Sequence, residues 1–181
     1  MTTTSWPFAR VLPGVVLAVT LGGSLAGCGS SSGAVESSQS LDRLGAQLAK
    51  DGEMSRLFLA GTAAGAEETV TEDATEDVSC PGGKRRSYRA SFTASSAVAG
   101  GDGTAEDVRN AEGLAAQTAF SRAGYDLVTD VDKSSSELPA TLDFANDPKS
   151  PDQARTFRTT VKVDGDEFTT TITGTTACIA D

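Results

Sequence analysis

The chain has 181 residues, with 25 acidic and 15 basic side chains, a formal net charge of −10 and no histidine. Phosphate backbones repel so negative a protein, which excludes a nucleic acid partner. Without histidine the chain lacks the usual general base and zinc ligand, and neither Ser-His-Asp nor Cys-His catalysis is possible. We therefore expect no metal, no cofactor and no enzymatic activity.

The first patterned segment is an apolar stretch from Val11 to Ala26, which follows a single basic residue, Arg10. A short basic region, an apolar run and small residues are the parts of a secretory signal peptide. The stretch is about 17 residues long, at the lower limit for spanning a bilayer, so cleavage is favoured over an uncleaved transmembrane anchor.

The tetrapeptide that ends this stretch, Leu25-Ala26-Gly27-Cys28, resembles the lipobox of bacterial lipoproteins, and the bias toward Ala, Gly, Thr and Asp resembles those of actinobacteria. The resemblance implies that residues 1–27 are removed and that Cys28 is acylated. The protein would then be held in the lipid bilayer, on the extracytoplasmic face of the cell membrane. The resemblance covers about 33 residues and extends to no family for the rest of the chain.

Residues 28–40 are rich in Ser and Gly and too polar to pack a core, which predicts a flexible tether. Residues 41–181 then fit a single domain. Its first element is a helical pattern from Leu41 to Phe58, interrupted at Lys50-Asp51-Gly52, which predicts two short helices or one broken helix. The next stretch, Glu67 to Asp77, has six acids and no base and predicts an exposed loop.

A half-buried strand is predicted from Lys84 to Ser96, because its apolar residues alternate with polar ones. The apolar face is Tyr88, Ala90, Phe92 and Ala94. The strand also carries a basic cluster: Lys84, Arg85, Arg86 and Arg89. Two interpretations stay open for it: the cluster binds an anion such as a cell-wall phosphate or a carboxylate, or it pairs with the acidic run before it.

A helix is predicted from Thr104, as N-cap, to Ala123, with a stripe of small residues at Val108, Ala111, Ala115 and Ala119 facing the sheet. Further strands are predicted at Tyr125–Val131 and Ala140–Phe144. The last predicted element is a hairpin, with strands Phe157–Val163 and Asp166–Ile172 joined by the turn Asp164-Gly165. That turn sets Val161 opposite Phe168 and Phe157 opposite Ile172.

Apart from Cys28, the chain has two cysteines, Cys80 and Cys178. An even pair in an exported protein predicts a disulfide. The element order predicts an α+β fold with an antiparallel sheet of four to five strands and two to three helices, packed on one face. The predicted core is Tyr88, Phe92, Leu127, Leu142, Phe144, Phe157, Val161, Phe168 and Ile172, covered by Leu41–Phe58.

The sequence thus favours a membrane-anchored lipoprotein that acts as a binding module for an envelope protein or small ligand. One alternative is a hydrolase with two carboxylates about 5 to 10 Å apart in a cleft. Another is a small-ligand carrier, which needs a cavity under the sheet. An aromatic sugar-binding platform is disfavoured, because only 6% of the residues are aromatic.

Overall fold

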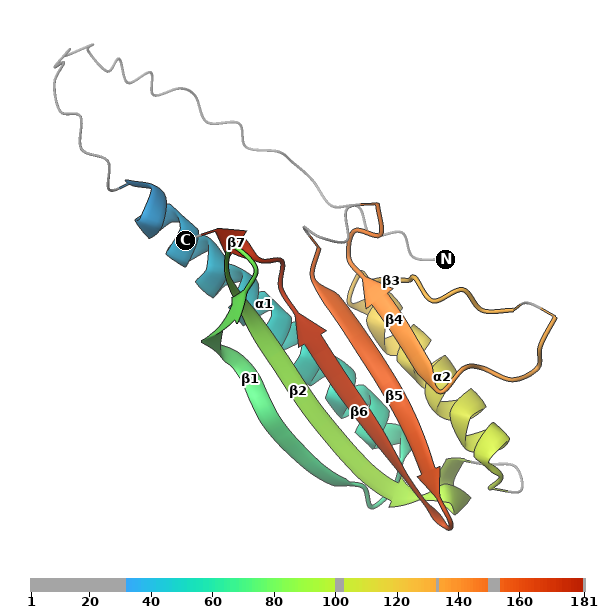
Figure 1. Cartoon of the computed structure of the whole chain (residues 1–181). Helices are drawn as coiled ribbons and strands as arrows, with labels where there is room; N and C mark the ends of the chain where they lie inside the picture. The colour runs from blue at the N-terminus through green and yellow to red at the C-terminus, as the bar shows by residue number, and fades with distance from the viewer. Residues whose placement is uncertain (1–31, 100–102, 133, 150–153, 181) are drawn as a thin grey trace, which may run out of the picture. The chain divides into compact units, whose positions relative to one another are not determined.

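The computed structural model describes residues 32–99, 103–132, 134–149 and 154–180. Two α-helices and seven antiparallel strands occur among them, which confirms the α+β class and the antiparallel sheet but exceeds the predicted four to five strands. Both helices lie behind the sheet and leave its other face open (Figure 1). The signal peptide, the lipobox and Cys28 lie outside the described residues.

The longest helix, α1 (Ser32–Thr62), is continuous, so the predicted break at Lys50-Asp51-Gly52 is wrong. Gly52 was expected to interrupt the helix, yet it is needed for packing. A Cβ built on it would lie 2.6 Å from the Tyr88 ring of the sheet. The helix also starts at Ser32, inside the segment 28–40 predicted as a tether, because polar residues can extend a helix that packing further along has nucleated.

The sheet begins with a long edge strand, β1 (Glu67–Cys80), where an exposed loop was predicted. An edge strand tolerates charged side chains because one side of it faces water. Register shifts interrupt its pairing with β2 (Gly83–Ser95) on both sides of Glu72 and Asp73. At the second shift, Ala74 has a positive φ of 63° and turns its methyl group into the core. The acidic run is therefore a bulged strand.

The helix α2 (Ala105–Arg122) matches the prediction: Thr104 caps it, in a capping box with Asp107. A short 3₁₀ helix, η1 (Ser96–Ala99), precedes it. The predicted stripe is only partly right, because Ala111 and Ala115 lie at the margin of the buried face. The residues of α2 that are buried are Val108, Glu112, Gly113, Ala116, Ala119 and Phe120.

The remaining strands are β3 (Asp126–Leu127), β4 (Thr141–Ala145), β5 (Thr156–Asp164), β6 (Glu167–Thr175) and β7 (Ile179–Ala180). The sheet order is β1-β2-β6-β5-β4-β3, with β7 on β2. The strand predicted over Tyr125–Val131 is reduced to two residues, since the chain leaves the sheet after Leu127. Leu127 is accordingly only half-buried, whereas the other predicted core residues are buried.

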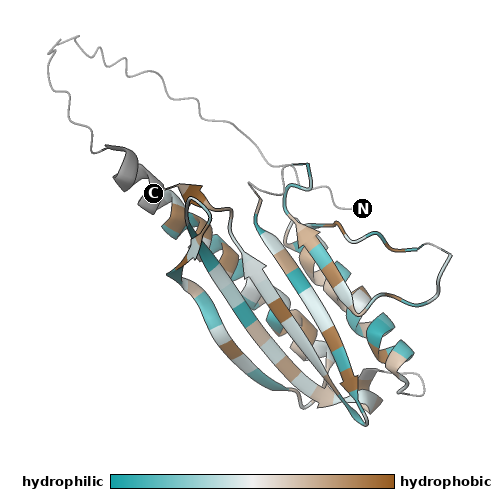
Figure 2. Cartoon of the chain, in the orientation of Figure 1, coloured by the Kyte–Doolittle hydropathy of each residue, from teal (hydrophilic) through white to brown (hydrophobic). Residues whose placement is uncertain are grey.

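The hairpin of β5 and β6 is present, but its predicted register is wrong by two residues. Gly165 and Asp166 form the turn, and Val161 lies opposite Thr170 instead of Phe168. Only Gly165 has a positive φ, 61°, as the first position of a type II′ turn requires. Because side chains alternate with period two, the slip leaves every residue on its predicted face. The alternation appears as colour bands along β2, β5 and β6 (Figure 2).

Aromatic rings fill the space between the sheet and α2. Phe120, which the predicted core omitted, lies at their centre, with ring centroids 4.7 Å from Phe144 and 4.9 Å from Phe157. Tyr125 packs edge-on against Phe157 at 5.1 Å. These ring contacts pack α2 against β4 and β5 of the sheet.

Candidate functional site

The basic cluster predicted on β2 is divided between the two faces of the sheet. Lys84 and Arg86 lie on the face of β2 that packs against α1, whereas Arg85 and Arg89 lie on the other face, because neighbouring side chains on a strand alternate. The four residues therefore do not form one anion-binding site.

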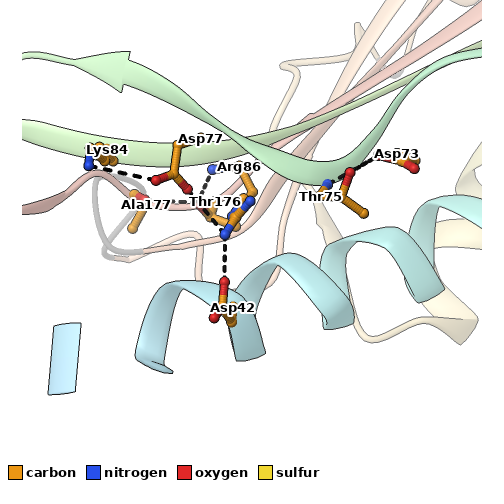
Figure 3. A network of polar contacts seen from close by, with 8 residues as sticks. All are labelled: Asp42, Asp73, Thr75, Asp77, Lys84, Arg86, Thr176 and Ala177. Carbon is orange, nitrogen blue, oxygen red and sulfur yellow. Dashed lines mark hydrogen bonds and ion pairs between the residues drawn. The ribbon is translucent and has the colours of Figure 1, made fainter. Parts of the chain in front are cut away.

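Arg86 belongs to an ion-pair network between α1 and the sheet (Figure 3). Its Nη2 lies 2.5 Å from Asp42 of α1 and 3.1 Å from Asp77 of β1, and its side chain is only 11% exposed. Lys84 Nζ is 3.7 Å from the other carboxylate oxygen of Asp77. For these two residues the structure supports the second interpretation, pairing with the acidic run.

The predicted disulfide is confirmed: Cys80 is bonded to Cys178. The bond joins the end of β1 to the segment before β7, and it closes a sequence separation of 98 residues. Both cysteines are therefore structural.

Two buried carboxylates went unnoticed in the sequence. Asp51 is 2% exposed and accepts hydrogen bonds from Gln47 Nε2 at 2.7 Å and from the Tyr125 hydroxyl at 2.8 Å. Arg155 donates from Nε to the same hydroxyl at 3.1 Å and lies 3.6 Å from Asp51. Burial raises the pKa of Tyr125 well above its ordinary value. These contacts tie the middle of α1 to the start of β5, which is a structural role.

The second buried carboxylate is Glu112 of α2, which is 4% exposed and points into the core. Its one hydrogen bond comes from Thr170 Oγ1, at 3.1 Å. Burial raises its pKa to about 7. Its place one turn after Val108 and one turn before Ala116 was the sequence signal that could have revealed it.

The open face of the sheet carries hydroxyl groups in rows that run across the strands. One row is made of hydroxyl side chains alone and crosses five strands, from β1 to β4: Thr69, Ser91, Thr171, Thr160 and Thr141. Two further rows are also rich in them: Thr93 and Thr169 with Glu67 and Lys162, and Ser87, Thr175 and Thr156 with Ala145. The spacing Thr-x-Thr-x-Thr-x-Thr over 169–175 was the sequence signal for this pattern.

Between the all-hydroxyl row and the row of Thr175 lies a charged row: Glu72, Arg89, Thr173, Arg158 and Asp143. It is symmetric about β6, since an arginine and then an acid follow on each side of Thr173. Arg158 holds Asp143 through two hydrogen bonds, of 2.6 and 3.2 Å. We call these four rows together the open face.

Two shallow hollows lie on the open face, one on each side of β6. The first, about 440 Å³, is lined by Thr71, Glu72, Arg89, Ser91 and Thr171. The second, about 670 Å³, is lined by polar residues, Asp143, Thr156, Arg158, Thr173 and Thr175, by Gly174, and by apolar ones, Val128, Phe144, Ala145, Pro148 and Phe157. Each hollow thus combines one arginine, one carboxylate and several hydroxyl groups, and the second also has an apolar part.

Nothing in the described part of the chain forms a helix long and apolar enough to cross a membrane. In the same residues, no group of three or more Cys, Asp or Glu side chains is arranged to hold a metal ion. Comparison of the chain with protein-family models, curated proteins and solved structures finds no match. Within the described residues, the protein is an α+β fold whose two helices cover one face of the sheet and leave the polar face free of helices.

Proposed function

We propose that this protein is a lipid-anchored, extracytoplasmic binding module that holds a component of the cell envelope on its open face and catalyses no reaction. The observation that carries the proposal is the open face itself. The helices cover the opposite side of the sheet, so this is the side of the sheet on which a ligand meets a broad set of polar groups.

The two alternative functions have less support. A carrier needs a cavity between the sheet and the helices, but stacked rings of Phe120, Phe144 and Phe157 occupy the space under β4 and β5. A carboxylate-dependent hydrolase needs two acids facing one cleft. Glu112, the acid with the raised pKa, points into the core and bonds Thr170, away from both hollows.

The anchor is proposed at Cys28, on the lipobox resemblance. The disulfide between Cys80 and Cys178 supports an oxidising, exported setting. Since α1 starts at Ser32, four residues after Cys28, the chain between them spans at most about 14 Å.

Membrane fractionation with lipid labelling tests the anchor. Cys28→Ala is expected to abolish labelling and to leave the protein unprocessed or released, whereas Ser30→Ala, a control two residues away, should behave as the wild type. Labelling of the Cys28→Ala protein would overturn the anchor.

Cosedimentation of the full chain with isolated cell envelopes tests the binding surface. The double variant Arg89→Gln/Arg158→Gln removes both arginines of the charged row and is expected to lower retention. Arg43→Gln is the matched control, because Arg43 is exposed on α1, the helix behind the sheet, and belongs to none of the four rows. Equal retention of the double variant and the control would refute the assignment of the open face.

A further inference from the structure

We infer that the open face binds a neutral, extended glycan; this inference rests on the proposed function and names its ligand. The first reason is the chemistry of the two hollows. A guanidinium group and hydroxyls donate hydrogen bonds, and a carboxylate accepts them, so each hollow can hold a polyhydroxyl ligand through both kinds of group. Arg89 with Glu72 and Arg158 with Asp143 provide this set on the two sides of Thr173.

The hydroxyl groups keep hydrogen-bonding capacity for a ligand. Three pairs bond to each other across strands: Thr93 with Thr169 at 3.0 Å, Thr156 with Thr175 at 3.1 Å and Thr141 with Thr160 at 3.3 Å. In such a pair one hydroxyl donates and the other accepts. The accepting hydroxyl therefore still has its own hydrogen, and both oxygens keep lone pairs.

The charges of the face select a neutral ligand. In the charged row, Glu72 lies opposite Arg89 and Asp143 opposite Arg158, so two positive charges are balanced by two negative ones. An anionic polymer would meet these acids and a chain whose net charge is −10. A neutral ligand is repelled neither by these acids nor by the net charge of the chain.

The same face is a poor surface for a protein or a lipid. Binding hot spots of protein interfaces are enriched in Trp, Tyr and Arg, while Ser and Thr are under-represented. Among the described residues, the aromatic side chains of the sheet, such as Tyr88, Phe157 and Phe168, are buried on the helix side. The open face thus offers two arginines and many hydroxyls; Val128 and Pro148 add apolar surface at the second hollow, but no aromatic side chain is exposed there.

The spacing of the hollows suits a chain of sugars. Arg89 and Arg158 are both register partners of Thr173, on β2 and β5. They are therefore separated by two strand spacings, about 10 Å. Two sugar units of an extended glycan cover a comparable distance, so one chain crossing β6 can reach both hollows.

Without aromatic stacking, each hollow is expected to bind a single sugar weakly. A polymer that occupies both hollows gains from the effective concentration of its second unit. We therefore expect a neutral polysaccharide to bind at least tenfold more tightly than its own monosaccharide.

Affinity electrophoresis of the purified full chain through gels containing dextran, amylose, galactomannan or the anionic polygalacturonate tests the inference. At least one neutral polysaccharide is expected to retard the protein. Polygalacturonate is expected not to retard it. Arg89→Gln/Arg158→Gln should lower the affinity at least tenfold, and Arg43→Gln, on α1, should leave it unchanged. Urea unfolding of each variant checks that it is folded.

Three results would overturn the inference: no retardation by any neutral member of the panel, retardation by polygalacturonate at least as strong as by the neutral members, or equal retardation of the double variant and the wild type. The envelope assay separates this failure from that of the proposed function. If the double variant loses envelope retention while no neutral polysaccharide binds, the open face remains the binding surface and the ligand is not a neutral glycan.

Discussion

Replacement of Glu112 by Gln is predicted to remove a pH-dependent loss of stability. The side chain is buried beside Thr170, and burial raises its pKa from 4.5 to about 7. Below pH 4.5 the carboxyl group is protonated in both the folded and the unfolded protein. Between pH 4.5 and 7 it ionises in the unfolded chain but stays protonated in the folded one, so stability falls as the pH rises.

The size of this loss follows from the shift. A difference of about 2.5 pKa units at 1.36 kcal/mol per unit corresponds to about 3 kcal/mol, reached above pH 7. Glu112→Gln keeps an oxygen that accepts from Thr170 but cannot ionise. The free energy of unfolding of the variant, relative to the wild type, should therefore rise by about 3 kcal/mol between pH 4.5 and 8.

Urea unfolding followed by circular dichroism at four or five pH values measures this difference. The remaining carboxylates contribute equally to both proteins and cancel. Glu106→Gln, at an exposed position of the same helix, is the control, and the rise for Glu112→Gln should exceed the change for this control. A flat difference for Glu112→Gln would refute the reasoning, because it would mean that the buried carboxyl titrates as it does in water.

Three further predictions concern stability. Gly52→Ala should destabilise the protein by about 1 to 3 kcal/mol in urea unfolding, because the methyl group would overlap the Tyr88 ring. Gly61→Ala in the same helix, where no atom lies within 4 Å, should instead be neutral or stabilise by up to about 1 kcal/mol; equal effects would contradict the packing argument. Tyr125→Phe should cost about 1 to 3 kcal/mol by removing a donor to buried Asp51, and an unchanged urea midpoint would show that water replaces the hydroxyl. Replacing Cys80 and Cys178 by Ser should cost about 2 to 5 kcal/mol, and reduction of the wild type should give the same loss; two alkylatable thiols in the untreated folded protein would disprove the bridge.

The elements with a clear local signal were predictable. Thr104 and Asp107 predicted the start of α2, and the alternation from Tyr88 to Ala94 predicted the buried face of β2. The two paired cysteines followed from their number and the expected compartment. In each of these cases neighbouring residues, or a count of residues, carry the information.

The errors arose where a distant partner reverses a local preference. Gly52 is favourable inside α1 only because Tyr88, from another element, occupies the space beside it. The acidic run forms β1 because an edge strand has one side in water, where charged side chains are tolerated. The hairpin register was set by the turn at Gly165, and two registers with the same faces satisfy the hydrophobic pattern equally.

The alternating threonines of residues 169–175 indicated part of the open face in the sequence. Their grouping into rows was not, because it depends on which strands are neighbours and in what register. Arg89 and Arg158 are 69 positions apart in the chain, yet both lie opposite Thr173. A site assembled in this way can be found only once the strand order is known.

The bulged strand β1 has a consequence for how copies of the protein coexist. Anchored molecules would diffuse in two dimensions, where collisions between sheet edges are frequent. A straight, uncharged edge strand would then template intermolecular pairing. The register shifts near Ala74 interrupt the regular row of backbone groups, and side chains such as Glu72 and Glu76 give each edge the same charge. Crowded neighbours would therefore repel one another at this edge, and each copy would remain separate with its hydroxyl rows accessible.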